Sequence, residues 1–189
     1  RSWDCWIDSP RLAATAKLRL REDRARSIGA GLLLAYAVRQ IHPAQALPLH
    51  IETDALKKPF LPNIPDLHFN LSHSGKWVVC AVADQPIGID IEQISHPMDD
   101  VVQRFFSPAE RAHLDAFGPA ERSAAFCELW VLKESYMKAT GLGFHLPLEQ
   151  LSIRPGSPPV LLRNGMPVSG EAALCLFPDP NYRLAIAST

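Results

Sequence analysis

The 189-residue sequence predicts an α+β fold, in which helices and strands occur in separate blocks along the chain. Two long stretches have helical character, at residues 19–41 and 121–140. Short apolar runs typical of strands are grouped between residues 67 and 91, and again between residues 151 and 187. This grouping of like elements, in a chain long enough for a sizeable core, is the basis of the fold-class prediction.

The N-terminal third is expected to supply a strand, a long helix and a loop. Residues 3–7 alternate loosely between apolar and polar side chains and predict a strand. Gly29 and Gly31 weaken the helix at residues 19–41, which predicts that another segment approaches its backbone closely. The proline-rich stretch at residues 43–65 predicts a loop.

Three strands are expected next. The apolar runs at residues 67–71 and 77–82 flank Ser72-His73-Ser74-Gly75, whose small and polar residues predict the turn of a hairpin. The third run, residues 87–91, follows Pro86.

The remainder is expected to contain more helices and a second block of strands. Residues 99–106 predict a short helix, and Ser107-Pro108-Ala109-Glu110 has the pattern of a helix start, with a capping serine and a glutamate three residues later. The long helix at residues 121–140 is predicted to stop at Gly141. The remaining apolar runs predict strands, at residues 151–154, 160–163, 172–177 and 182–187.

Composition narrows the function classes. No apolar stretch is long enough to span a bilayer and no secretory leader is present at the start, so we expect a cytoplasmic protein that does not contact membranes. A net charge of −1 argues against a general nucleic-acid binder. The four cysteines form no Cys-x-x-Cys pair, which argues against a zinc site and predicts buried free thiols.

The charge is unevenly distributed. Residues 1–88 hold eleven Lys and Arg against eight Asp and Glu, whereas residues 89–189 hold eight against twelve. Either the two halves differ by chance, or the first half binds an anion and the second holds a metal ion.

Asp90 and Glu92 are the first candidates for a metal site. Residues two apart in a strand point to the same face, so both carboxylates are expected to project together from the apolar segment Gly88-Ile89-Asp90-Ile91-Glu92. Like charges held so close destabilise each other unless a cation lies between them. Solvated acids at a strand end are the alternative interpretation.

Glu134 and Lys138 strengthen this hypothesis. With Trp130 they are spaced by four residues and share one face of the predicted helix. An exposed Glu-Lys pair is the alternative, but the charges interrupt an otherwise apolar helix, and buried charges need partners. Carboxylate oxygens are the ligands that Mg²⁺ prefers.

Several segments could bind an anion such as phosphate. The predicted turn at residues 72–75 offers hydroxyls, an imidazole and backbone amides. The pair Lys57-Lys58 and the cluster of Arg21, Arg24, Arg26 and Ser27 add further candidates. A solvated polar turn or charged face explains each of these when it is taken alone.

Four segments, in this order and spacing, resemble the 4′-phosphopantetheinyl transferases of the surfactin-synthetase-activating type. They are FNLSHSG at residues 69–75, IGIDIE at 87–92, RFFSPAE at 104–110 and WVLKESYMK at 130–138. The resemblance implies two similar α+β halves in a pseudo-twofold arrangement, here residues 1–88 and 89–189, with the active site in the cleft between them. It also implies transfer of 4′-phosphopantetheine from coenzyme A to a serine of an apo acyl or peptidyl carrier protein, with adenosine 3′,5′-bisphosphate as the second product.

The resemblance also implies roles for single residues. Asp90, Glu92 and Glu134 would hold Mg²⁺ on the diphosphate of coenzyme A. Glu134, directly or through a metal-bound water, would act as the base for the carrier serine. Lys138 would add a cation to this site and is, with Glu134, a candidate catalytic residue. The nucleotide end of coenzyme A would be bound by further polar residues, namely Arg26, Ser27, Lys58, Ser72, His73 and Lys138.

Some positions depart from the family or remain open. Lys57 occupies a position where the family usually has glycine. Glu110 matches an acidic residue that has been considered catalytic, but the capping box explains it fully and is the interpretation we favour. Lys133 lies about 100° round the helix from Glu134, so a structural or phosphate-facing role is expected for it.

Two other functions compete with the transferase. A metal-dependent nuclease also combines strand acids with a Glu and a Lys, but it needs a basic groove, and the second half is acidic. An inactive module that only binds coenzyme A or a carrier protein is the non-enzymatic alternative. A single chain with both halves is expected to work as a monomer.

Overall fold

The computed structural model describes residues 5–168, 170–175, 177 and 179–189, and its mixed helices and strands agree with the predicted α+β class. The helices are α1 (Ser9–Ala16), α2 (Arg21–Ile41), α3 (Asp99–Phe105), α4 (Pro108–Asp115), α5 (Pro119–Thr140) and the 3-10 turn η1 (Gly143–His145). The strands are β1 (Glu52–Thr53), β2 (Pro59–Phe60), β3 (His68–Ser74), β4 (Trp77–Ala83), β5 (Ile87–Gln93), β6 (Leu151–Arg154), β7 (Val160–Arg163), β8 (Met166–Pro167), β9 (Glu171–Cys175) and β10 (Tyr182–Ser188). In the described residues, no helix has the length and hydrophobicity that a membrane crossing requires.

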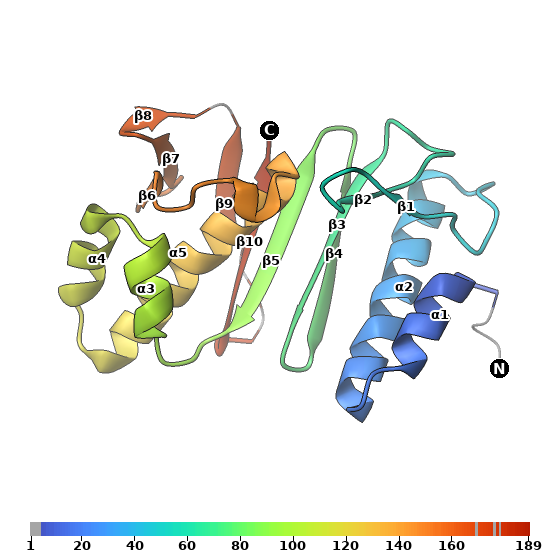
Figure 1. Cartoon of the computed structure of the whole chain (residues 1–189), viewed down its shortest axis with the longest axis horizontal. Coiled ribbons are helices and arrows are strands. Elements are labelled where there is room, and N and C mark those ends of the chain that lie inside the picture. Colours follow the sequence, from blue (N-terminus) through green and yellow to red (C-terminus); the bar gives the residue numbers. More distant parts are fainter. Residues whose placement is uncertain (1–4, 169, 176, 178) are drawn as a thin grey trace.

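The long strands β3, β4, β5, β9 and β10 lie in the middle of the molecule, with helices on either side of them (Figure 1). A three-stranded antiparallel sheet has the order β5-β10-β9, and α5 packs across β5 and β10. The β3–β4 hairpin lies beside β5 and packs on its other side against α2, which α1 covers in turn. Leu34 and Phe69 belong to the core between α2 and the hairpin, while Ala81 and Ile89 belong to the core between the hairpin and β5. The chain therefore has two helix-backed layers that meet between β3 and β5.

Strand β5 is at the edge of its sheet, and side chains of β3 take the place of a further strand there. Three oxygens on alternate residues of β3 accept hydrogen bonds from alternate backbone N–H groups of β5, at 2.9, 3.4 and 3.0 Å: Asn70 Oδ1 from Ile89, Ser72 Oγ from Ile91, and Ser74 Oγ from Gln93. We call this row of hydrogen bonds the β3–β5 seam. It joins the two layers and fixes the register of β5, the strand that carries Asp90 and Glu92.

Most elements were predicted, but several details differ. Helix α5 ends at Gly141, which has a left-handed conformation (φ 72°), as predicted. Residues 5–7 form a turn and a bend instead of the predicted strand, whose residues 3 and 4 lie outside the described part of the chain. Residues 72–74 continue strand β3, so the hairpin turn is confined to residues 75–76. The predicted loop at residues 43–65 contains β1 and β2, and the predicted strand at 172–177 is described only as β9.

Helix α1 was not predicted, although its sequence carries start signals. Asp8 is the N-cap, and its side chain accepts a hydrogen bond from the Arg11 N–H at 2.8 Å. A proline occupies the first turn. The predicted close approach to the glycines of α2 is confirmed at Gly31, where a Cβ would lie 2.9 Å from Arg11 Cδ, but not at Gly29, where the nearest atom would be 3.9 Å away.

Gly88 allows α5 to lie directly on β5. A Cβ at this position would be 2.0 Å from the Ser135 carbonyl oxygen and 2.4 Å from the Ala139 nitrogen, both backbone atoms of α5. Because a backbone cannot rotate out of the way, we expect Gly88→Ala to push the helix off the strand and to lower the free energy of unfolding by about 3 kcal/mol. Gly29→Ala is the matched control, and it is expected to raise that free energy by about 0.5–1 kcal/mol because alanine favours the helix. Denaturant unfolding of both variants measures the two effects, and equal changes would contradict the contact.

Lys57 adopts a backbone conformation that favours glycine. Its φ is 68°, and it closes the turn between β1 and β2, in which Asp54 Oδ1 accepts hydrogen bonds from the Leu56 and Lys58 N–H groups at 2.8 and 2.9 Å. We expect Lys57→Gly to raise the free energy of unfolding by about 0.5–1 kcal/mol, because left-handed backbone is unfavourable for side chains with a Cβ. Asn164→Gly is the control: its φ is 52°, but asparagine tolerates this region, so a smaller gain is expected. Thermal unfolding of the two variants tests whether Lys57→Gly gains more stability than Asn164→Gly.

Candidate active site

The predicted metal ligands lie where β5 meets α5. Asp90 and Glu92 are on β5, and Glu134 and Lys138 are on the helix that packs across this strand. Lys138 Nζ donates a hydrogen bond to Asp90 Oδ1 at 2.5 Å and approaches Ser72 Oγ at 3.2 Å. The structure thus brings acids of the strand and charged groups of the helix into one cluster beside the β3–β5 seam.

Asp90 is the most buried member of this cluster, with only 2% of its surface exposed. Its Oδ1 accepts from Ser72 Oγ at 2.7 Å as well as from Lys138. Its Oδ2 is buried without a hydrogen-bond partner among the described residues. Burial raises the pKa of this carboxyl, and Lys138 and the hydroxyl of Ser72 oppose that shift. A buried carboxylate oxygen without a partner is costly, and a cation would satisfy it.

The pKa values of the other two acids, Glu92 and Glu134, are also raised. Burial raises the pKa of Glu92, and the neighbouring Asp90 adds to the effect, while Ser74 Oγ donates to Glu92 Oε2 at 2.8 Å. Burial also raises the pKa of Glu134 to about 7, with further contributions from Asp90 and Glu92 that Lys138 opposes. In both carboxyls burial is the largest cause of the shift, and a cation bound nearby would oppose it.

The donor set fits a hard divalent cation. Three carboxylates, among them that of Asp90 with its unpartnered Oδ2, supply oxygen ligands of the kind that Mg²⁺ binds. In the part of the chain that the structure describes, however, no three acidic, His or Cys side chains are gathered as a ready ligand set. Lys138 instead neutralises Asp90 directly.

Lys58 lies at the end of α5 rather than in open solvent. Its Nζ donates hydrogen bonds to the carbonyl oxygens of Lys138 and Ala139 at 2.8 and 2.7 Å, so it caps the helix that carries Glu134. Burial lowers the pKa of this amine. Next to it is a hollow of about 310 Å³ between the two layers, lined by residues that include Lys58, Phe60, His68, Pro86 and Thr140.

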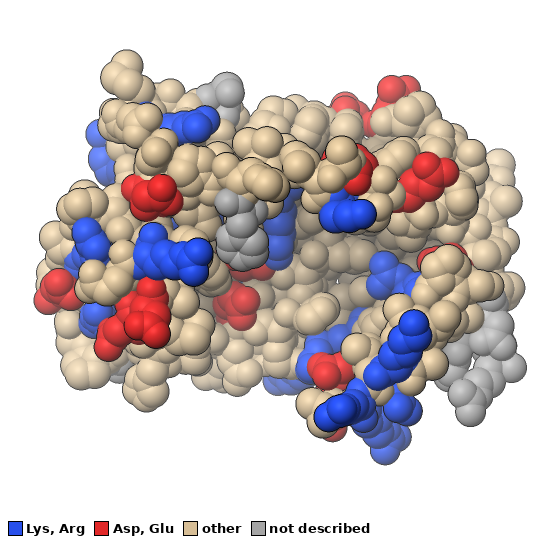
Figure 2. Space-filling model, viewed as in Figure 1, with Lys and Arg blue, Asp and Glu red and all other residues tan. Residues whose placement is uncertain are grey.

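The other predicted anion-binding residues are more dispersed. Ser72 is buried and faces Asp90, whereas His73 is exposed on β3. Arg26 forms an ion pair with Asp23 and donates to the Gly75 carbonyl at 2.6 Å. Ser27 shares a hydrogen bond with Thr15 at 2.5 Å, which ties α2 to α1. Figure 2 shows Lys and Arg gathered around the N-terminal end of α2, beside the tip of the β3–β4 hairpin.

Glu110 has a structural role. It completes a capping box with Ser107 at the start of α4, as we had favoured. A further partner of Glu110 is Lys133, whose Nζ lies 2.9 Å from Glu110 Oε2. Both side chains are fully buried, with 0% and 1% of their surfaces exposed, so Lys133 has the structural role rather than the phosphate-facing one. A lysine inside an apolar helix stretch was the signal for this buried pair.

Profiles of two related families match almost the whole chain. The family described as the 4′-phosphopantetheinyl transferase superfamily matches residues 86–187, and the one described as 4′-phosphopantetheinyl transferase, N-terminal, matches residues 7–85. The chain belongs to the 4′-phosphopantetheinyl transferase superfamily. The resemblance noted in the sequence is thereby confirmed.

Several relatives in this superfamily are about two fifths identical to the chain over the residues that align. The 4′-phosphopantetheinyl transferase psf-1 of Bacillus pumilus is 38% identical over 97% of this chain and 79% of its own length. A 4′-phosphopantetheinyl transferase of Bacillus subtilis and the transferase Sfp of Bacillus subtilis strain 168 are 40% and 38% identical over 71% of this chain. In both of these, the match covers only 60% of the relative.

Solved structures of holo-(acyl-carrier-protein) synthases are also similar to part of the chain. The enzyme from Bacillus anthracis, in complex with coenzyme A (3′,5′-ADP), matches 55% of this chain and 96% of its own with 20% identity and a TM-score of 0.45. The enzyme from Helicobacter pylori, in complex with coenzyme A, matches 54% of this chain and 97% of its own with 23% identity and a TM-score of 0.41. The family assignment rests on the sequence matches alone.

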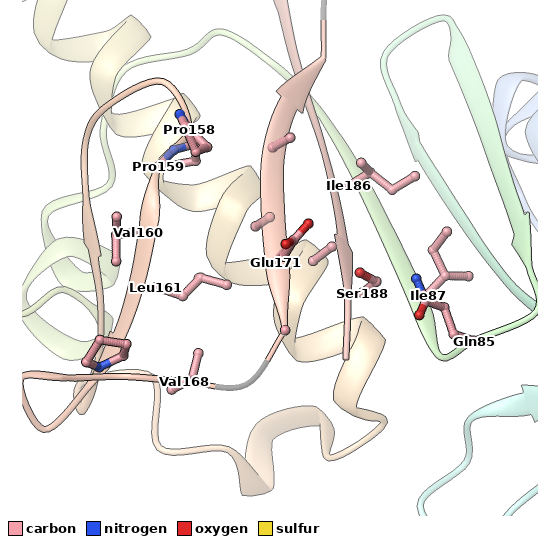
Figure 3. A pocket seen from close by; sticks show the side chains of 15 residues that line it. Gln85, Ile87, Pro158, Pro159, Val160, Leu161, Val168, Glu171, Ile186 and Ser188 are labelled. Carbon is pink, nitrogen blue, oxygen red and sulfur yellow. The ribbon is translucent and has the colours of Figure 1, made fainter.

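A second hollow of this transferase-family chain lies away from the carboxylates of Asp90, Glu92 and Glu134. It has a volume of about 430 Å³ and is mostly apolar, and Figure 3 shows it between the segment around Pro158 and Leu161 and the strand residues Ile87 and Ile186. Glu171 lies at this hollow, which includes none of the four charged cluster residues. The hollow is therefore separate from the candidate active site.

The expected burial of the four cysteines is confirmed only in part. Cys80, Cys127 and Cys175 form no disulfide, and Cys127 is buried. Cys5 is exposed. Burial raises the pKa of the Cys127 thiol to about 12, so this group is not a nucleophile at neutral pH.

Proposed function

We propose that the chain transfers 4′-phosphopantetheine from coenzyme A to a serine of an apo acyl or peptidyl carrier protein. The observation that carries this proposal is the cluster of Asp90, Glu92, Glu134 and Lys138 in a chain of this superfamily, with a buried carboxylate oxygen that lacks a partner. The serine oxygen forms a bond to the phosphorus next to the pantetheine. The diphosphate bridge breaks, and adenosine 3′,5′-bisphosphate leaves.

The residues present can hold Mg²⁺. Asp90, Glu92 and Glu134 would bind the ion, which when bound neutralises charge on the diphosphate of coenzyme A. Lys138 contributes a second positive charge beside Asp90, within reach of the same substrate group.

Glu134 is suited to take the proton from the carrier serine. Without a bound cation, burial raises the pKa of Glu134 to about 7, so its carboxylate binds a proton more strongly than an ordinary glutamate does. We assign Glu134, directly or through a water molecule, as the acceptor of the serine proton while the new bond to phosphorus forms.

The nucleotide end of coenzyme A is assigned to the space between the layers. Lys58 lines the hollow of about 310 Å³ there, and its amine can exchange helix carbonyls for phosphate oxygens. Ser72 and His73 on β3, and Arg26 and Ser27 on α2, complete the proposed binding surface. We further infer that the chain acts in the cytoplasm, where coenzyme A and apo carriers occur together, and that it acts as a monomer, because one chain carries all of these groups.

Mass spectrometry of apo carrier proteins incubated with coenzyme A and Mg²⁺ tests the function. We expect a phosphopantetheine mass gain on one serine, which EDTA and the variant Asp90→Ala should both abolish. Binding of coenzyme A without any gain across a panel of carriers would favour an inactive module. Cleavage of DNA or RNA without binding of coenzyme A would favour a nuclease.

A further inference from the structure

Two serines of the β3–β5 seam each contact an acid of the proposed cation site. Ser72 Oγ accepts from one β5 N–H and donates to Asp90, the preceding residue of that strand. Ser74 Oγ repeats the arrangement two residues further on: it accepts from the Gln93 N–H at 3.0 Å and donates to Glu92 Oε2 at 2.8 Å. Asn70, the third member of the seam, accepts from the Ile89 N–H at 2.9 Å, and among the described residues no hydrogen bond joins its side chain to either acid.

The geometry of Ser74 fixes the direction of its hydroxyl. A backbone N–H can only donate, so the serine oxygen accepts from Gln93 and its single proton remains for another acceptor. That acceptor is Glu92 Oε2. The carboxylate is therefore held at one oxygen by a group anchored in the backbone of its own strand, and Oε1 is left for another ligand.

We propose that Ser74 is a positioning residue that orients the Glu92 carboxylate toward the bound cation, an inference that rests on the proposed function. Ser74 differs here from Ser72, whose oxygen also lies 3.2 Å from Lys138 Nζ and which belongs to the proposed coenzyme A surface. Hydrogen-bond partners of metal ligands restrict how those ligands turn, and their loss commonly weakens metal binding. The position of Ser74 on β3 and of Glu92 on β5 makes the cation site depend on both layers of the molecule.

Mn²⁺ binding in the presence of coenzyme A, without carrier protein, tests this role. Electron paramagnetic resonance titration measures the free ion, so no catalytic turnover is needed. We expect Ser74→Ala to raise the Mn²⁺ dissociation constant about 10-fold. Ser74→Thr, which retains the hydroxyl, is expected to bind Mn²⁺ as the native chain does.

Asn70→Ala is the matched control. It removes a hydrogen bond from the same seam, so it should lower the thermal unfolding midpoint without changing the Mn²⁺ dissociation constant. Should Ser74→Ala fail to fold, Ser74→Val replaces it, because valine has the shape of threonine without the hydroxyl.

The outcomes separate this proposal from the proposed function. The positioning role would be overturned if Ser74→Ala bound Mn²⁺ as tightly as the native chain, or if Asn70→Ala raised the Mn²⁺ dissociation constant as much as Ser74→Ala. In either case, transfer of phosphopantetheine by the native chain would still support the transferase. Absence of Mn²⁺ binding to the native chain with coenzyme A would overturn the cation site and the positioning role together.

Discussion

Glu134→Gln is expected to lower phosphopantetheine transfer by about 100-fold or more while making the metal-free protein more stable at pH 8. A general base contributes on the order of 100-fold to 10,000-fold to a rate, and glutamine cannot accept the serine proton. It also removes one of the three proposed cation ligands. The initial rate of carrier labelling by coenzyme A measures the loss.

The gain in stability follows from the direction of the pKa shift. Burial raises the pKa of Glu134 to about 7 in the folded chain, above its ordinary value, so the folded state binds this proton more tightly than the unfolded state does. Its favourable contribution is present below the ordinary pKa and is lost as the pH rises through about 7. At pH 8, Glu134→Gln should therefore raise the free energy of unfolding by about 1–2 kcal/mol, and at pH 4 the gain should vanish.

Glu128→Gln provides the control on the same helix. Glu128 pairs with Arg183 at 2.8 Å and lies outside the cluster, so its substitution should leave transfer unchanged. Labelling by Glu134→Gln at the native rate, or a stability gain that is the same at pH 4 and pH 8, would contradict the role assigned to Glu134.

Lys133→Met is expected to lower the free energy of unfolding by about 3–5 kcal/mol, because it leaves the buried carboxylate of Glu110 without its countercharge. Methionine keeps most of the apolar stem, so packing changes little. The Lys133 ammonium also donates to the carbonyl oxygens of Phe105 and Leu148, at 3.0 and 2.9 Å, and to that of Leu151. Its loss would leave these acceptors unsatisfied where α3, α5 and β6 meet.

The same substitution at Lys76 separates burial from ion pairing. Lys76 lies 2.9 Å from Asp179, the same N–O distance as in the Lys133–Glu110 pair, but its side chain is 69% exposed. Lys76→Met should give little or no measurable change, because water screens an exposed pair. Urea unfolding of both variants measures the difference. A similar loss in the two would show that the buried pair is no more important than the surface one.

Local patterns predicted the faces on which the members of the charged cluster lie, and the family resemblance predicted that they come together. The two-residue period of a strand placed Asp90 and Glu92 on one face, and the four-residue spacing of a helix did the same for Glu134 and Lys138. The structure confirms that these elements pack together. Their role as cation ligands stays a prediction, as do the pseudo-twofold relation and the division into residues 1–88 and 89–189, a junction that lies within β5.

Features that depend on distant partners could not be predicted from the sequence. Lys58 was expected either to bind an anion or to be solvated, yet it caps a helix some eighty residues further along the chain. Ser72 and Ser74 were expected in a turn, because serine and glycine favour turns locally. Pairing with β4, which places Ser72 opposite Val79 and Ser74 opposite Trp77, outweighed that preference and extended β3. Such choices are made by tertiary contacts, which a local pattern does not contain.

The β3–β5 seam has a consequence for solubility. Unpaired N–H groups along an edge strand are a template on which another molecule can add a strand. Many proteins begin to aggregate in this way. Here hydroxyl and amide side chains cover the margin in place of a backbone. Any loosening of one layer from the other would uncover that template, so conditions that open the space between the layers should also promote self-association of this chain.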